Sequence, residues 1–203
     1  MRSRQIISAG MIAISLVATL VRADTTLPDD SRFFDQMTGY RISNYRSPTP
    51  EIIEGARRID ASELNQFLAR NIDSPIVLLD AYGAQHFTIT DTGDWIIAGT
   101  HESLPGALWL PSIGWGDVEP WALKYLEETL AGATVGNKAV PVVTYCRTDC
   151  WLGWNATRRL QELGYKNLLW FPGGTDEWAD AGFPLEPTTP QRLGPDALEV
   201  FDK

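Results

Sequence analysis

Residues 139–163 read AVPVVTYCRTDCWLGWNATRRLQEL and contain both cysteines of the chain, Cys146 and Cys150. Before the cysteines, residues 140–145 form a short run of mainly β-branched and aromatic side chains, which is typical of a buried parallel strand. After them, leucine and alanine recur at helical spacing until Gly164, which is placed to end a helix. The pattern therefore predicts a strand, a tight turn that carries both cysteines, and a helix.

This predicted position of the cysteines favours thiol chemistry. The first N–H groups of a helix lack internal partners and carry the positive end of the helix dipole, so they stabilise a thiolate or a bound anion. Cys146, the last residue before the turn, is therefore expected to be nucleophilic near neutral pH. Arg147 adds a positive charge beside it, and Asp149 opposes that charge.

Cys150 admits two interpretations, a redox partner of Cys146 or one half of an inert structural disulfide. A bridge that closes so small a loop constrains the unfolded chain little, which favours the redox partner. Residues four apart on a regular helix have Cβ atoms about 5–6 Å apart, whereas a disulfide needs roughly 3.5–4.5 Å. A bridge between the two cysteines therefore requires the turn to leave helical geometry.

Strands and helices are expected to alternate along the rest of the chain. Asp60 with Glu63 predicts the start of a helix, and residues 76–80 predict a buried strand that ends at Asp80. Alternation of this kind indicates an α/β fold, a parallel sheet with helices on both faces, whose reactive site lies at the carboxyl ends of the strands. The further expected elements are a strand at 107–110, a helix at 121–131 ending at Gly132, a strand at 167–171, and a short helix capped by Thr175.

Two segments lack a clear periodic pattern. Residues 81–103 are interpreted as one long connection, and its histidines, His86 and His101, are expected to be loop or surface residues rather than catalytic bases. The tail from residue 183 is rich in proline and is expected to pack loosely.

The first 23 residues predict a secretory signal peptide. Arg2 and Arg4 precede an apolar run of about 16 residues, shorter than the roughly 20 that a membrane span needs, and small residues follow at the cleavage position. We therefore expect a periplasmic protein that has no membrane association once the signal is removed.

Charge and cysteine content exclude several classes of function. The chain has 17 basic and 26 acidic side chains, and because three arginines lie in the signal, the mature chain carries a formal charge of −12. Such a chain is repelled by nucleic acid and by anionic lipid. Two neighbouring cysteines are no disulfide scaffold, and with His86 and His101 they form no recognised zinc pattern, so no metal is expected.

Several motifs, taken in order, resemble a single rhodanese domain. They are Asp80 after an apolar strand, LPGA at 104–107, YCR at 145–147, and a Gly-Gly pair followed by Trp178. The resemblance implies a rhodanese-like domain at 59–187, which leaves an N-terminal extension at 24–58 after the predicted signal peptide at 1–23, and a C-terminal tail at 188–203. More narrowly, CRTDCWLGW at 146–154, WLP at 109–111 and the signal peptide resemble the exported rhodanese-like CXXCW motif family associated with PQQ-dependent catabolism.

The rhodanese resemblance implies sulfur transfer. Cys146 would attack a sulfur donor and carry a persulfide in a cradle of backbone N–H groups from residues 147–151, with Cys150 as its redox partner. Asp80 would hold the surrounding loops by hydrogen bonds. Thiosulfate is a disfavoured donor because Asp149 would repel a dianion and Trp151 would crowd it. A phosphatase loop would need arginine six residues after the cysteine, where Leu152 stands. The residues expected to contact substrate are Arg147, Thr148, Asp149 and Trp151.

The narrower resemblance implies a role in PQQ-dependent alcohol oxidation, through sulfur transfer or thiol-redox chemistry. The expected partners are a small sulfur donor or thiol and a PQQ-dependent dehydrogenase system. No cofactor is required, although Trp151 and Trp154 would offer stacking surfaces for a quinone such as PQQ if they are not core and lid residues instead. The alternative hypothesis is a non-catalytic accessory module that binds a quinone cofactor or a partner dehydrogenase.

Overall fold

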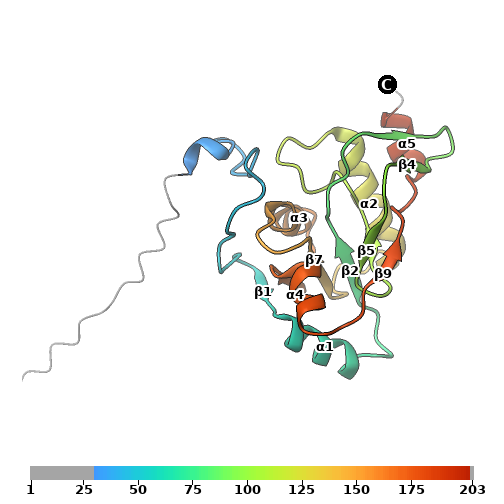
Figure 1. The fold of residues 1–203 in the computed structure, drawn as a ribbon. Coiled ribbons are helices and arrows are strands. Elements are labelled where there is room, and N and C mark those ends of the chain that lie inside the picture. Colours follow the sequence, from blue (N-terminus) through green and yellow to red (C-terminus); the bar gives the residue numbers. More distant parts are fainter. Residues whose placement is uncertain (1–29, 202–203) are drawn as a thin grey trace, which may run out of the picture.

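A five-stranded parallel sheet forms the centre of the computed structural model, which describes residues 30–201 (Figure 1). The predicted signal peptide and residues 24–29 of the predicted extension lie outside these residues. Every neighbouring pair in the sheet is parallel, which confirms the predicted α/β class. The spatial order of the strands is β1 (Ala56–Arg58), β8 (Leu168–Phe171), β7 (Val142–Tyr145), β2 (Val77–Asp80) and β6 (Leu108–Trp109).

Helices cover both faces of the sheet, as predicted. Successive side chains of a strand point to opposite faces, so Val143 packs toward α1 (Ala61–Arg70) and α4 (Gly174–Asp180), while Val142 lies in the core on the other face. That second face is covered by α2 (Pro120–Thr134), α3 (Trp151–Glu162) and α5 (Pro195–Phe201). Within residues 30–201, no helix is long and apolar enough to cross a membrane.

The helix predicted from Asp60 and Glu63 is confirmed with its capping box. The Asp60 carboxylate accepts the Glu63 N–H at 2.8 Å, and the Glu63 carboxylate accepts the Asp60 N–H at 3.1 Å. Such a cap contributes about 1 kcal/mol. The helix expected at 121–131 runs further than predicted, because Gly132 lies inside α2 and the chain turns only at Val135, which has φ 50°.

The interpretation of residues 81–103 as one connection is wrong. They contain a hairpin of β3 (Phe87–Ile89) and β4 (Trp95–Ile97), followed by β5 (His101–Ser103). β5 pairs with β9 (Glu186–Thr188) from the far end of the chain. Strands of three residues are too short for a clear alternation pattern, and the partner of β5 is more than eighty residues away.

The expectation of a loosely packed tail is also wrong. Leu193 and Ala197 are buried against α2, and the Glu128 carboxylate of α2 accepts the backbone N–H groups of Asp196 and Ala197 at 3.0 and 2.9 Å. These N–H groups have no partner within their own helix, so a side chain from α2 satisfies the start of α5.

The N-terminal segment, residues 30–50, runs along α3 before the chain enters the sheet at β1 (Figure 1). We call this segment the strap. It begins with a short 3₁₀ turn, η1 (Ser31–Phe33), and is otherwise irregular. Asn155 of α3 ties the strap down, because its amide oxygen accepts the Arg41 N–H at 3.1 Å and its amide nitrogen donates to the Arg41 carbonyl at 2.8 Å.

Candidate functional site

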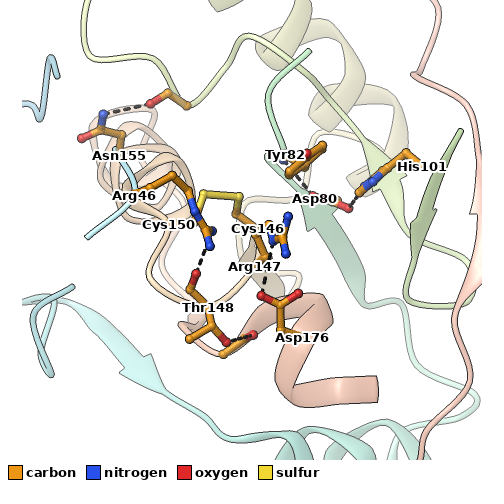
Figure 2. Close-up of a disulfide and its surroundings, with 12 residues drawn as sticks. Arg46, Asp80, Tyr82, His101, Cys146, Arg147, Thr148, Cys150, Asn155 and Asp176 are labelled. Carbon is orange, nitrogen blue, oxygen red and sulfur yellow. Dashed lines mark hydrogen bonds and ion pairs between the residues drawn. A yellow bond between two sulfur atoms is a disulfide. The ribbon is translucent and has the colours of Figure 1, made fainter. Parts of the chain in front are cut away.

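Cys146 and Cys150 form a disulfide across the turn between β7 and α3 (Figure 2). Their Cα atoms are 6.1 Å apart. Cys150 is the N-cap of α3 with extended backbone, and Asp149 before it has φ 55°, so the turn does leave helical geometry. Both cysteines are buried, with exposed fractions of 2% and 5%. The bridge is compatible with a redox pair and with a structural staple.

α4 holds one side of the cysteine turn. The Thr175 N–H donates to the Cys146 carbonyl at 3.1 Å, and the Thr148 hydroxyl donates to the Gly173 carbonyl at 2.9 Å. Thr175 was expected to cap α4 with its hydroxyl; that prediction is wrong, because Gly173 is the N-cap and no side chain caps the helix. Arg147 pairs with Asp176 at 3.3 Å, and this hydrogen bond raises the pKa of Arg147. Asp176 of α4 therefore neutralises part of the positive charge of Arg147.

The strap holds the other side of the turn. The Ser47 N–H donates to the Asp149 carbonyl at 3.1 Å, and the Trp151 N–H donates to the Tyr45 carbonyl at 2.9 Å. Arg46 donates to the Thr148 carbonyl at 2.7 Å (Figure 2). One of the five N–H groups expected to cradle a persulfide, that of Trp151, is therefore already bound to the strap.

Trp151 lies behind the turn and is only 2% exposed. Its ring is 5.3 Å from the ring of Phe34, the Arg41 guanidinium lies 4.6 Å from its centre, and its indole N–H donates to the Ser47 hydroxyl at 3.0 Å. Trp151 is thus covered by the strap, contrary to its expected position as a lid or a stacking surface. Trp154 packs against it at 5.2 Å.

A cavity of about 610 Å³ lies at the carboxyl ends of β2 and β6, the edge of the sheet where the site was expected. Of the residues predicted for the site, only Cys150 lines it; Thr148 and Asp149 line a second, smaller cavity of about 350 Å³ beside Pro48. The charge of Asp149 and the ring of Trp151 therefore do not face the main cavity. The walls around Cys150 comprise Tyr45, Arg46, Tyr82, His101, Trp109 and Trp115.

Asp80 is fully buried below the cavity and joins the end of β2 to β5. Its carboxylate accepts the Tyr82 N–H at 2.8 Å and the Ser103 hydroxyl at 2.5 Å, and lies 2.7 Å from Nε2 of His101 (Figure 2). Because the single Ser103 proton goes to Asp80, the Ser103 oxygen accepts from the Tyr145 hydroxyl at 2.9 Å. Burial, and secondly the charge of Asp80, raise the pKa of Tyr145 well above its usual value.

His101 was expected to be a loop or surface residue, and that prediction is wrong. It lies in β5, its side chain is 11% exposed, and its ring stacks on Tyr82 at 4.6 Å and contacts the ring of Trp109 at 4.4 Å. No spacing in the sequence predicts this position of His101, because the pairing of β5 with β9 brings it to Asp80. His86 is exposed in a turn, as predicted. In the part of the chain that the structure describes, no three histidine, cysteine or acidic residues are grouped to hold a metal.

The family model for the rhodanese-like domain matches residues 63–181, more than half of the chain. The protein therefore belongs to the rhodanese-like domain family. The search among curated proteins found no match.

Solved structures of the same fold are similar to this chain at low sequence identity. They include a thiosulfate sulfurtransferase from Pseudomonas aeruginosa, with 21% identity over 71% of this chain and 23% of that chain, at a TM-score of 0.44. A rhodanese-like domain from an Anabaena protein has 19% identity over 66% and 80% of the two chains, at a TM-score of 0.42. A yeast protein tyrosine phosphatase of the rhodanese family has 18% identity over 64% and 88%, at a TM-score of 0.44. This chain spans less than a quarter of the length of the Pseudomonas protein.

Proposed function

We propose that this rhodanese-like protein is exported and uses Cys146 and Cys150 as a reversible dithiol–disulfide couple, in sulfur transfer or thiol exchange that supports PQQ-dependent alcohol oxidation. The observation that carries the proposal is the disulfide itself. It spans the turn at the carboxyl end of β7, and one of its cysteines lines the 610 Å³ cavity beside it. A purely structural bridge has no need of such a cavity.

The chemistry of the couple follows from its two states. In the disulfide state neither sulfur is a nucleophile, so an external thiol must first reduce the bridge. In the dithiol state, the thiolate of one cysteine would attack the outer sulfur of a donor, displace the rest of the donor and become a persulfide. Attack of the other cysteine on the inner sulfur of that persulfide would then break the sulfur–sulfur bond, release hydrosulfide and restore the disulfide.

The compartment and the link to PQQ rest on the resemblance described above. The signal peptide supports export to the periplasm. Three residues separate the two cysteines before Trp151, whereas the CXXCW motif has two, so the chain departs from the motif of that family at this point. The partners we propose are a small sulfur donor or thiol and a PQQ-dependent dehydrogenase system, and no cofactor is required.

One observation favours a second candidate, the binding of a quinone or of a partner dehydrogenase without catalysis. Aromatic rings of Tyr45, Tyr82, Trp109 and Trp115 line the cavity, and Arg46 offers a positive charge to an acidic ligand. Planar ligands stack well on such walls. PQQ would contact these residues rather than Trp151, which the strap covers.

Mass spectrometry of the mature protein tests the proposed function. We expect the isolated protein to be two hydrogens lighter than the dithiol, to gain two alkyl groups after reduction, and, once reduced, to return to the disulfide mass with release of hydrosulfide on incubation with a persulfide or thiosulfate donor. In the single-cysteine variant that keeps the attacking thiol, the added sulfur atom stays on the protein, and the variant that lacks both cysteines gains none. A bridge that cellular thiols do not reduce, or a reduced protein that takes no sulfur and exchanges with no disulfide, would contradict the proposal.

The two candidates separate through matched variants. Cys146→Ser abolishes the dithiol–disulfide cycle, and it leaves quenching of tryptophan fluorescence by PQQ unchanged if the protein only binds a quinone. Trp115→Leu, which alters the cavity wall and keeps both cysteines, weakens PQQ binding in that case and spares the dithiol–disulfide cycle.

A further inference from the structure

The two cysteines differ in what surrounds them. Cys150 lines the 610 Å³ cavity and Cys146 does not. The backbone of Cys146 is enclosed, since a Cβ on Gly174 of α4 would lie 2.6 Å from its carbonyl carbon and one on Gly153 of α3 would lie 3.3 Å from its backbone nitrogen. Of the two cysteines, a molecule in the cavity therefore meets Cys150.

A histidine held by a buried carboxylate lines the same cavity. Asp80 is an acceptor as a carboxylate, so the Nε2 atom of His101 carries the hydrogen between them at 2.7 Å. In the neutral imidazole, Nδ1 is then the basic nitrogen. Among the described residues, Nδ1 has no hydrogen-bond partner and it is not a buried unpaired atom, which leaves it available to the cavity.

Tyr82 connects the two groups. Its side chain packs against the cysteine pair, and its ring stacks on that of His101 at 4.6 Å, nearly parallel at 9° (Figure 2). Cys150 and His101 therefore line the same cavity, and Tyr82 packs both against the cluster that contains Cys150 and against the His101 ring. The stack also fixes the plane of the imidazole, as Asp80 fixes its tautomer.

We propose that Cys150 is the sulfur that meets the substrate, that His101 exchanges the proton in that reaction, and that Asp80 positions His101. The proposal rests on the proposed thiol function and specifies its order of events. It exchanges the roles expected from the rhodanese resemblance, in which Cys146 attacks first.

The reaction balances with an organic disulfide as oxidant. In the reduced protein the Cys150 thiol gives its proton to Nδ1 of His101, and the thiolate attacks one sulfur of the disulfide in the cavity. That disulfide bond breaks, the departing thiolate takes the proton from His101, and a mixed disulfide remains on Cys150. Cys146 then attacks the Cys150 sulfur as a thiolate, its proton passing to the second departing thiolate. Two thiols are released, and the substrate has been reduced as the cysteine pair is oxidised.

Single-cysteine variants test which sulfur meets the substrate. With 5,5′-dithiobis(2-nitrobenzoate) as the probe, we expect Cys150 in Cys146→Ser to react at least tenfold faster than Cys146 in Cys150→Ser, each rate divided by that of the same variant in urea. An equal or faster reaction of Cys146 overturns the proposal. The comparison needs no natural substrate and uses variants with a single cysteine. Its failure is therefore distinguishable from failure of the proposed function, which is judged on the protein with both cysteines.

The role of His101 is tested by a pH profile in the Cys146→Ser background. The amide nitrogen of His101→Gln donates to Asp80 in place of Nε2, so only the basic Nδ1 is lost. We expect the variant to react at least fivefold more slowly than its parent at each pH between 6 and 8. Above pH 9, where the thiol ionises unaided, the two rates should approach each other. His86→Gln, an exposed histidine, is the control and leaves the profile unchanged. A uniform loss at every pH, or no loss, overturns the role of His101.

Other charged and titratable groups lie around the imidazole and can also affect this pH profile. They are Asp80 and Tyr82 of the β2 end, Tyr145 through Ser103, Arg46 on the cavity wall, and the exposed Glu102 and Glu186 along β5 and β9. Of these, only Asp80 hydrogen-bonds the ring directly. If circular dichroism shows that His101→Gln is unfolded, Tyr82→Phe is measured instead, because it keeps the ring stack and the cavity wall. Tyr82→Phe must preserve the acidic limb of the pH profile, and loss of that limb overturns the proposal.

Discussion

At the scale of single residues, the buried Arg41 makes many contacts that a substitution would remove. Its side chain is 0% exposed, and its guanidinium lies within about 5 Å of the rings of Phe33, Phe34 and Trp151. It pairs with Asp30 at 3.3 Å and also donates to strap carbonyls and to the Ser47 hydroxyl. One buried cation thus gives an irregular segment a defined conformation next to the disulfide.

Arg41→Ala is therefore expected to lower the free energy of unfolding by about 3 kcal/mol, because it leaves a cavity among three rings and several unpaired acceptors. The urea midpoint of the disulfide-bonded protein measures this. Arg32→Ala is the matched control: its guanidinium also lies 4.6 Å from the ring of Phe33 but is exposed, and a change below about 0.5 kcal/mol is expected. If the two substitutions lowered the free energy of unfolding equally, burial of Arg41 would contribute nothing to stability.

At the scale of elements, the strap depends on a close approach of its backbone to the loop before α2. A Cβ on Gly116 would overlap the carbonyl of Arg41, and one on Gly114 would lie 2.6 Å from the Leu152 carbonyl oxygen. Only glycine leaves room for these backbones. The strap lies outside residues 63–181, which the family model matches, yet its residues Tyr45 and Arg46 line the cavity.

Gly116→Ala is expected to destabilise the protein by about 1–3 kcal/mol and to detach the strap, because backbone cannot move aside as a flexible side chain can. Detachment would expose Trp151, so its fluorescence should shift to the red at denaturant concentrations where the domain is still folded. Gly132→Ala is the control; that position is in α2 with nothing within 4 Å of the new Cβ, and a gain of about 0.5–1 kcal/mol is expected. An unshifted Trp151 emission in Gly116→Ala would refute the close-packing account.

At the scale of the whole molecule, buried tyrosines make stability depend on alkaline pH. Burial raises the pKa of Tyr40, Tyr45, Tyr125 and Tyr145 above the usual value. Tyrosines of the unfolded chain ionise near pH 10, so above that pH the unfolded state binds fewer protons than the native state and the free energy of unfolding falls. Below pH 10 the stabilisation is fully present.

Each of the fully buried Tyr125 and Tyr145 should contribute a loss of up to about 1.4 kcal/mol per pH unit above pH 10. Urea denaturation at pH 8, 10 and 11 measures the slope. Tyr125→Phe removes one ionising group together with its hydrogen bond to the Gln191 carbonyl, so it lowers stability at pH 8 and makes the alkaline slope shallower. A slope that Tyr125→Phe does not change would exclude this tyrosine as a contributor.

Local pattern in the sequence specifies four of the five sheet strands, the capped helix at Asp60, and the turn that carries Cys146 and Cys150, because buried strands and helix starts have their own periodicity and capping chemistry. β1 is the exception, since it is a three-residue strand within the segment interpreted as the N-terminal extension. His101, Trp151 and the strap are different, since only tertiary structure gives them their places. The pairing of β5 with β9 brings His101 to Asp80, and buried Arg41 draws the strap over Trp151. Contacts between residues far apart in the chain leave no periodic signal, so the cavity wall opposite Cys150 is decided by packing alone.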